Sequence, residues 1–357
     1  MKTKIFLLLL FLSIAFGCSS NDTNGDIQQP DESVYFPPIN SDTWETKSID
    51  DLSWNQDALV NLLDFLDEKN TKSFIILHDG KIVLEEYMNG HDASKPWYWA
   101  SAGKTLTTAI SGIAQDEGII DLNAKVSNYL GEGWTSALLE KENLITCKHL
   151  LSMNSGLDDS LGDNVSKENL QYKADAGTRW AYHNVYKKMQ DVVALASGSN
   201  WNTYFTSKLK NKIGMTGNWI QNSDFNVYWS NTRSMARFGL LIYAKGKWNN
   251  SQIVPESFLS EATNTSQDIN KSYGYLWWLN GKASYHLPAT QLEFNGELIP
   301  NAPDDTFAAL GKNDQKIYVV PSKKLVIIRM GNKANNDALA LSSFDNDLWE
   351  KINLLIN

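Results

Sequence analysis

Residues 99–118 read W-A-S-A-G-K-T-L-T-T-A-I-S-G-I-A-Q-D-E-G and place Ser101 three residues before Lys104. Apolar side chains recur at helical spacing and predict a largely buried helix that ends at Gly118. Residues three apart share one helix face, so the lysine amine can reach the serine hydroxyl and activate it as a nucleophile. Burial lowers the pKa of a lysine toward the range that a base needs near neutral pH. The stretch therefore predicts acyl-transfer chemistry.

The same four-residue pattern also occurs at Ser207-Lys208-Leu209-Lys210, among further lysines, where it indicates a solvated helix face. Context separates the two matches, because Ser101 opens an apolar helix whose free amides and dipole favour a developing oxyanion. The alternative for Ser101 is an ordinary N-cap serine followed by a lysine that reaches solvent.

Composition excludes several classes of function. The chain has 357 residues, 42% of them hydrophobic and 20% charged, which suits one large or two interleaved globular domains. Its net charge is -9 and it has no basic tract, so nucleic acid is not an expected partner. The five histidines show no metal-ligand spacing, and we expect no metal and no organic cofactor. The G-x-S-x-G motif of Ser-His-Asp hydrolases is absent from the sequence.

The N-terminal sequence is typical of an export signal. Lys2 and Lys4 precede an apolar run from Ile5 to Phe16, which is too short to span a bilayer and predicts a signal peptide over residues 1–17. Gly17-Cys18 and the polar stretch after it resemble a bacterial lipoprotein cleavage site, so we expect lipidation of Cys18 and a tether over residues 18–44. The expected location is periplasmic or cell-surface, membrane-anchored through Cys18; secretion without lipidation is the alternative.

Strand signals lie at the two ends of the chain. Runs at 73–78 and 81–87 are joined by Asp79-Gly80, a strong hairpin signal, and runs at 316–320 and 325–330 precede a helix over 344–356. The middle shows mainly helical periodicity, for example over 185–196 and 231–244. We predict an α/β (α+β) fold in which residues 45–120 and 264–357 build an antiparallel sheet flanked by helices, with a helical domain over 121–263 inserted. A cleft is expected at the junction of these domains.

A third catalytic group is needed to pass the proton to the leaving group. Tyr182-His183-Asn184 is the best candidate, because a nearby lysine cation favours the phenolate and an asparagine can hold both the lysine and a substrate oxygen. Tyr87-Met88-Asn89 and Ser152-Met153-Asn154 are competing matches that indicate a turn and a helix exit.

These motifs together resemble the serine beta-lactamase and penicillin-binding protein superfamily, specifically its class C-like branch with related esterases, D-aminopeptidases and amide hydrolases. The resemblance implies a beta-lactamase/transpeptidase-like fold and rests on motifs in family order. They are the hairpin at 79–87, Ser101 to Lys104, the segments 121–130 and 145–157, Tyr182 to Asn184, and the segments 214–216, 232–239, 273–278 and 311–331.

The resemblance also implies roles. Ser101 would attack the acyl carbon, Lys104 would keep it reactive, and Tyr182 would carry the proton to the leaving group and then activate water. Asn184 would orient the substrate and the lysine. The oxyanion would bind the backbone amides of Ser101 and of the residue after a K-T-G-like triplet; the best match is Ala309-Leu310-Gly311, which makes Lys312 the second donor.

This triplet departs from the lactamases. Ala309 and Leu310 lack the charge and hydroxyl that normally hold a substrate carboxylate, although Lys312 or Arg179 could supply a charge from elsewhere. The leading hypothesis is therefore an exported serine hydrolase that cleaves an uncharged ester or amide, from a small-molecule or peptide-like substrate, through an acyl-enzyme. The alternatives are a D-alanyl-D-alanine carboxypeptidase or beta-lactamase, and an acyl-binding sensor that never turns over.

Overall fold

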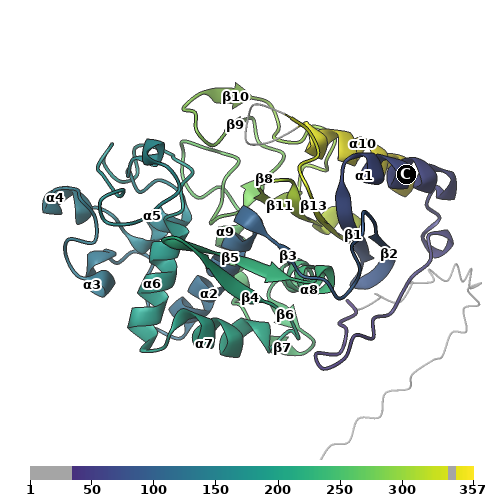
Figure 1. Cartoon of the computed structure of the whole chain (residues 1–357), viewed down its shortest axis with the longest axis horizontal. Helices are drawn as coiled ribbons and strands as arrows, with labels where there is room; N and C mark the ends of the chain where they lie inside the picture. Colours follow the sequence, from purple (N-terminus) through teal and green to yellow (C-terminus); the bar gives the residue numbers. More distant parts are fainter. Residues whose placement is uncertain (1–33, 337–342) are drawn as a thin grey trace, which may run out of the picture. The chain divides into compact units, whose positions relative to one another are not determined.

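The computed structural model describes residues 34–336 and 343–357, so the predicted signal peptide, Cys18 and the first part of the tether lie outside it. An antiparallel sheet of order β2-β1-β13-β12-β11-β8 draws its strands from both ends of the chain (Figure 1). This confirms the predicted α/β fold class; the domain boundaries stay a prediction. The strands are β1 Thr71–His78, β2 Lys81–Tyr87, β8 Trp278–Leu279, β11 Phe307–Gly311, β12 Gln315–Val320 and β13 Leu325–Gly331.

The first hairpin forms as its turn residues predict. His78 pairs with Lys81, which leaves Asp79 and Gly80 as a two-residue loop with φ of 45° and 85°. Positive φ at both positions is the type I′ geometry that matches strand twist. A Cβ on Gly80 would lie 1.9 Å from the Tyr35 carbonyl oxygen, so this position also requires glycine for space.

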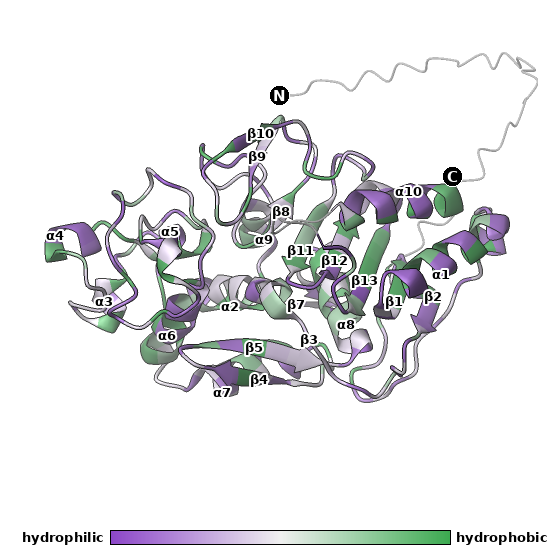
Figure 2. Ribbon diagram, turned by 45° about the horizontal axis from the view of Figure 1, so that its top comes forward, coloured by the Kyte–Doolittle hydropathy of each residue, from purple (hydrophilic) through white to green (hydrophobic). Residues whose placement is uncertain are grey.

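Helices cover both faces of the sheet. Side chains alternate along β12, so Ile317 contacts the α8 side, where a Cβ on Gly239 would lie 3.2 Å away, while Tyr318 packs edge-on against Trp349 of α10 at 5.6 Å. Both faces of the six-stranded sheet are therefore shielded from water, and β13 is coloured largely hydrophobic in Figure 2. The helices are α1 Leu59–Glu68, α2 Lys104–Asp116, α3 Ser127–Leu130, α4 Leu139–Glu142, α5 Cys147–Leu151, α6 Tyr186–Ser197, α7 Trp201–Phe205, α8 Thr232–Tyr243, α9 Glu256–Ala262 and α10 Phe344–Ile356.

The middle of the chain contains more strand than the sequence indicates. A three-stranded sheet of order β3-β5-β4 joins the segment before Ser101 to residues 218–230. The sequence predicts mainly helices and loops, with few strand signals, over residues 121–263. The remaining strands are β3 Trp97–Tyr98, β4 Asn218–Asn222, β5 Phe225–Ser230, β6 Lys247–Trp248, β7 Ser251–Gln252, β9 Ser284–His286 and β10 Glu293–Asn295.

Residues 34–44, at the end of the predicted tether, contact the folded part of the chain. Trp44 is buried and donates from its indole to the Gly80 carbonyl oxygen at 2.7 Å, and Arg237 donates to the Pro38 carbonyl oxygen at 2.8 Å. The hairpin and α8 thus supply hydrogen-bond partners to this segment, which also contains five apolar or aromatic residues, unlike the polar stretch before it. No helix in residues 34–336 or 343–357 has the length and hydrophobicity of a membrane span.

Candidate active site

Ser101 lies in a 3₁₀ turn, Ala100–Gly103, that leads directly into α2. The preceding residues hold this turn against the small sheet: the Trp99 amide donates to the Tyr228 carbonyl oxygen at 2.8 Å, and its indole donates to Ser230 Oγ at 2.8 Å. Ala100 has a φ of 48°, a left-handed conformation that is strained for a residue with a Cβ. The chain therefore bends sharply at the residue before the serine.

The structure brings Ser101 and Lys104 into contact. Lys104 Nζ donates to Ser101 Oγ at 2.7 Å, and the lysine side chain is buried with 4% of its surface exposed. Burial lowers the pKa of Lys104 to about 7, while the negative charge of Asp163 acts in the opposite direction. A large share of Lys104 is therefore neutral near pH 7 and able to accept the serine proton.

Tyr182 completes the cluster. Its ring lies 4.6 Å from Lys104 Nζ, and its hydroxyl hydrogen-bonds with Ser101. Burial raises the pKa of Tyr182 to about 12, so the phenol keeps its proton at neutral pH. A second ring, that of Tyr186, lies 5.0 Å from the same amine and was not identified from the sequence. The Lys104 amine is thus held between two aromatic rings and the serine.

Asn184 lies at the same site, but its hydrogen bond goes to a loop and not to Lys104, the partner expected from the sequence. Its amide nitrogen donates to the backbone carbonyl oxygen of Asp163 at 2.9 Å. This bond fixes the loop that carries the Asp163 carboxylate beside the lysine. Sequence reasoning missed Asp163, because it lies 59 positions after Lys104 in a loop without a recognisable motif.

The third motif, residues 309–311, lies beside the serine turn. A Cβ on Gly311 would lie 2.5 Å from the Trp99 carbonyl oxygen and 3.0 Å from the Ala102 amide nitrogen, so only glycine permits this approach. β8 pairs with β11 only at Phe307 and Ala308, which leaves the end of β11 as a sheet edge toward the serine. Ala309 and Leu310 are buried in the strand, and Lys312 is the residue of this segment that reaches the cavity described below.

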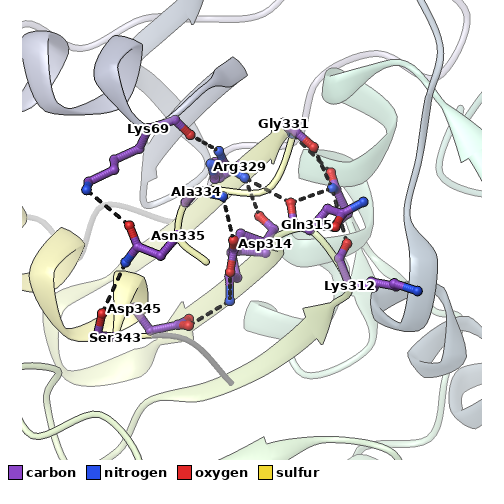
Figure 3. Close-up of polar contacts among 12 residues, drawn as sticks. Lys69, Lys312, Asp314, Gln315, Arg329, Gly331, Ala334, Asn335, Ser343 and Asp345 are labelled. Atoms are coloured by element: carbon purple, nitrogen blue, oxygen red, sulfur yellow. Dashed lines mark hydrogen bonds and ion pairs between the residues drawn. The ribbon is translucent and has the colours of Figure 1, made fainter. Parts of the chain in front are cut away.

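A buried polar network fixes the turn after Lys312 (Figure 3). Asn313 and Asp314 have φ of 61° and 62°, and the Arg329 guanidinium donates to their carbonyl oxygens at 3.2 and 2.8 Å. The Gln315 amide donates to the Asn313 and Gly331 carbonyl oxygens at 2.9 and 2.7 Å. These bonds stabilise a strained turn, and in Figure 3 the Lys312 side chain extends away from the network.

A cavity of about 430 Å³ opens onto the serine, a volume typical of small-molecule sites. Its walls combine the catalytic cluster with β3, β4 and β5. The lining residues are Tyr98, Ala100, Ser101, Lys104, Asp163, Asn184, Tyr186, Ile220, Gln221, Asn222, Phe225, Val227, Trp229 and Lys312. The alternation of large apolar residues at Phe225, Val227 and Trp229 is a strand signal that could have identified this wall from the sequence.

The competing motifs have other surroundings. Ser207 donates to the Tyr204 carbonyl oxygen, and Lys210 donates to that of Gly217, so this second serine and lysine bond elsewhere. Tyr87 donates to the Glu85 carboxylate at 2.6 Å on β2. Arg179 pairs with Asp159 at 2.6 Å and does not line the cavity. In the described ranges, no group of three or more His, Cys, Asp or Glu side chains is arranged to hold a metal ion.

Comparison with known proteins identifies one family and several solved structures that share the fold. A family model described as Beta-lactamase matches residues 68–347, which is most of the chain. A Bacillus anthracis structure provisionally described as a 6-aminohexanoate-dimer hydrolase has a TM-score of 0.67 and 20% identity, covering 89% of each chain. A Bacteroides dorei structure provisionally described as a beta-lactamase has a TM-score of 0.65 and 16% identity, covering 85% of this chain and 99% of that one.

EstCE1, described as a hydrolase with promiscuous acyltransferase activity, has a TM-score of 0.64 and 10% identity, covering 85% of this chain and 99% of that one. At such identities these structures show a shared fold. No curated protein matches the chain by sequence.

Proposed function

Because the chain belongs to the beta-lactamase family, we propose that it is a serine hydrolase that cleaves an uncharged ester or amide through an acyl-enzyme on Ser101. The observation that supports this most directly is the 2.7 Å contact between Lys104 Nζ and Ser101 Oγ, on a cavity large enough for a small substrate. Nucleophile and base within hydrogen-bond reach are the signature of covalent catalysis.

The proposed reaction uses three side chains. Neutral Lys104 accepts the hydroxyl proton while Ser101 Oγ bonds to the acyl carbon, and the carbonyl oxygen becomes an oxyanion held by the backbone amides of Ser101 and Lys312. Tyr182 donates its proton to the departing alkoxide or amine and is reprotonated from the Lys104 ammonium. In deacylation Tyr182 and Lys104 take a proton from water, and the water oxygen attacks the acyl carbon. The proton then returns to Ser101 Oγ as the ester bond breaks, which releases the acid and free Ser101.

The choice of an ester or amide follows from the third motif. Ala309 and Leu310 offer no charge or hydroxyl for a substrate carboxylate. Two of the structurally similar proteins are described, one provisionally, as a 6-aminohexanoate-dimer hydrolase and as a hydrolase with promiscuous acyltransferase activity; both descriptions fit cleavage or transfer at an acyl carbon, and the support for an uncharged substrate is the third motif alone.

One observation favours the alternative of a D-alanyl-D-alanine carboxypeptidase or beta-lactamase: Lys312 brings a positive charge to the cavity from the residue after the triplet. A fluorescent penicillin distinguishes the two proposals. We expect no stable labelling and no turnover of it, whereas covalent capture that Lys312→Ala abolishes would favour the carboxylate-binding alternative. A pre-steady-state burst on esters without later turnover would favour the acyl-binding sensor.

A fluorophosphonate probe tests the nucleophile. It should label the wild-type protein and not Ser101→Ala, with Ser207→Ala as the matched control that keeps full labelling, since Ser207 bonds to a helix carbonyl. Equal labelling of Ser101→Ala would refute the assignment. A Lys104→Ala variant that hydrolyses a short-chain ester as fast as wild type would refute the proposed base.

We also propose export and anchoring through a lipidated Cys18. The support is the apolar run over 5–16 followed by Gly17-Cys18. Metabolic labelling with a palmitate analogue should mark the membrane fraction of wild type and not Cys18→Ser. A soluble, unlabelled wild-type protein would support ordinary secretion instead.

A further inference from the structure

One wall of the active-site cavity is apolar and belongs to a single face of the small sheet. Along β5, Phe225, Val227 and Trp229 are half-buried, whereas the residues between them are buried on the opposite face. Cross-strand pairing adds Tyr98, opposite Trp229, and Ile220, opposite Val227, whereas polar Asn222, opposite Phe225, lines the far end of the same face. We call the five apolar or aromatic side chains, without Asn222, the β5 wall; all five line the cavity.

The β5 wall leaves hydrophobic surface exposed beside the nucleophile. Ile220 has 50% of its surface exposed, and the rings of Tyr98 and Trp229 lie 5.4 Å apart in a tilted arrangement at the serine end, where β3 leads into the Ser101 turn. A strand rises about 3.3 Å per residue, so the wall extends roughly 13 Å from Trp229 to Phe225. None of its five members is charged. The wall therefore suits an elongated apolar group better than a compact or charged one.

The position of Tyr182 indicates which part of the substrate lies there. In the proposed reaction Tyr182 delivers the leaving-group proton, and its ring packs against Tyr273 at 6.2 Å and Trp278 at 5.7 Å, neither of which belongs to the β5 wall. The leaving group therefore departs on the Tyr182 side, and the acyl group extends into the cavity along β5.

We infer that the β5 wall is an acyl-chain subsite and that the preferred substrates carry an uncharged, medium-length apolar acyl group. This inference rests on the proposed acyl-enzyme function and adds the substrate class to it. Burial of a methylene favours binding by about fourfold when it is complete, and by about twofold when only one side of the chain contacts the wall.

The test measures kcat/KM for p-nitrophenyl acetate, butyrate, hexanoate and octanoate, so that the leaving group stays constant. We expect a rise of roughly fiftyfold from acetate to octanoate in wild type, from about twofold for each of the added methylenes. Ile220→Ser should lower the octanoate-to-acetate ratio at least threefold. Leu195→Ser, which removes an exposed apolar side chain from α6 (62% exposed, against 50% for Ile220), is the matched control and should keep the wild-type ratio.

A flat or falling chain-length series in wild type, or an Ile220→Ser variant with the wild-type ratio, would overturn the acyl-chain subsite. Ser101→Ala distinguishes that failure from failure of the proposed function. If hydrolysis depends on Ser101 but not on chain length, only the subsite is wrong. If Ser101→Ala hydrolyses the esters as wild type does, the acyl-enzyme and the subsite inferred from it are both wrong.

Discussion

The lowered pKa of Lys104 predicts a pH dependence that an ordinary lysine would not give. Burial moves this pKa from 10.5 to about 7, which corresponds to roughly 5 kcal/mol between the two protonation states. About half of Lys104 is then neutral at pH 7, against roughly one molecule in 3000 for an unperturbed lysine. We therefore expect kcat/KM for a neutral ester to be level above about pH 8 and to fall about tenfold per pH unit below about pH 6.

Steady-state kinetics on p-nitrophenyl butyrate between pH 5 and 9, corrected for spontaneous hydrolysis, measures this profile. Asp163→Asn provides a directional check: the Asp163 charge raises the pKa of Lys104, so removing it should move the midpoint to lower pH. The midpoint is the relevant quantity, because Asp163 also lines the cavity and its loss changes substrate binding. A level profile down to pH 5, or a midpoint above pH 9, would refute neutral Lys104 as the base.

Three further predictions concern space, buried charge and stability. Gly311→Ala should reduce kcat at least tenfold in ester assays without unfolding the protein, since its Cβ would lie 2.5 Å from the Trp99 carbonyl oxygen; wild-type kcat would contradict the tight approach. Asp345→Ala should lower the free energy of unfolding in urea by about 2–3 kcal/mol, because buried Lys316 loses the carboxylate at 2.6 Å and keeps Asp314 at 3.2 Å, and the buried Tyr318 hydroxyl loses its acceptor; a loss below 1 kcal/mol would contradict this. Lys104→Met should be inactive yet more stable than wild type at pH 7, by up to about 4 kcal/mol. Between about pH 7 and 10.5 the unfolded wild-type chain binds a proton on Lys104 that the folded protein does not bind. The free energy of unfolding of wild type should therefore rise with pH over this window, and that of the variant should rise less.

Short sequence patterns predict much of the fold correctly. The Asp79-Gly80 turn specifies its own hairpin, and the helix over 344–356 forms at the predicted residues, because turn chemistry and apolar periodicity act over a few neighbours. The pairing of Ser101 with Lys104 is local as well: three residues of helix are enough to bring amine and hydroxyl together.

Features that depend on distant partners escaped prediction. Residues 34–44 were grouped with the polar stretch that precedes them, although five of these eleven residues are apolar or aromatic; they are held by Gly80 and Arg237. The alternation along β5 is a local signal, but its pairing with β3, a segment more than 120 positions earlier, depends on the tertiary fold and gives no signal in the sequence. Asp163 gave no signal at all, since its effect on Lys104 arises only where the loop and the helix meet.

The third motif, residues 309–311, shows that the recognition of a charged substrate group depends on both the local sequence and the tertiary structure. The sequence establishes that Ala309 and Leu310 replace the groups that would bind a carboxylate, and that a lysine follows the triplet. Whether this lysine reaches the substrate depends on the strained turn at Asn313 and Asp314, which a guanidinium 16 positions later holds in place. Because Arg329 lies on β13 with its side chain fully buried, the cavity end of β11 is fixed by the core of the sheet. In the proposed function, substrate charge preference would therefore depend both on the motif and on the core beneath it, and a substitution at Arg329 should displace Lys312 without contacting the substrate.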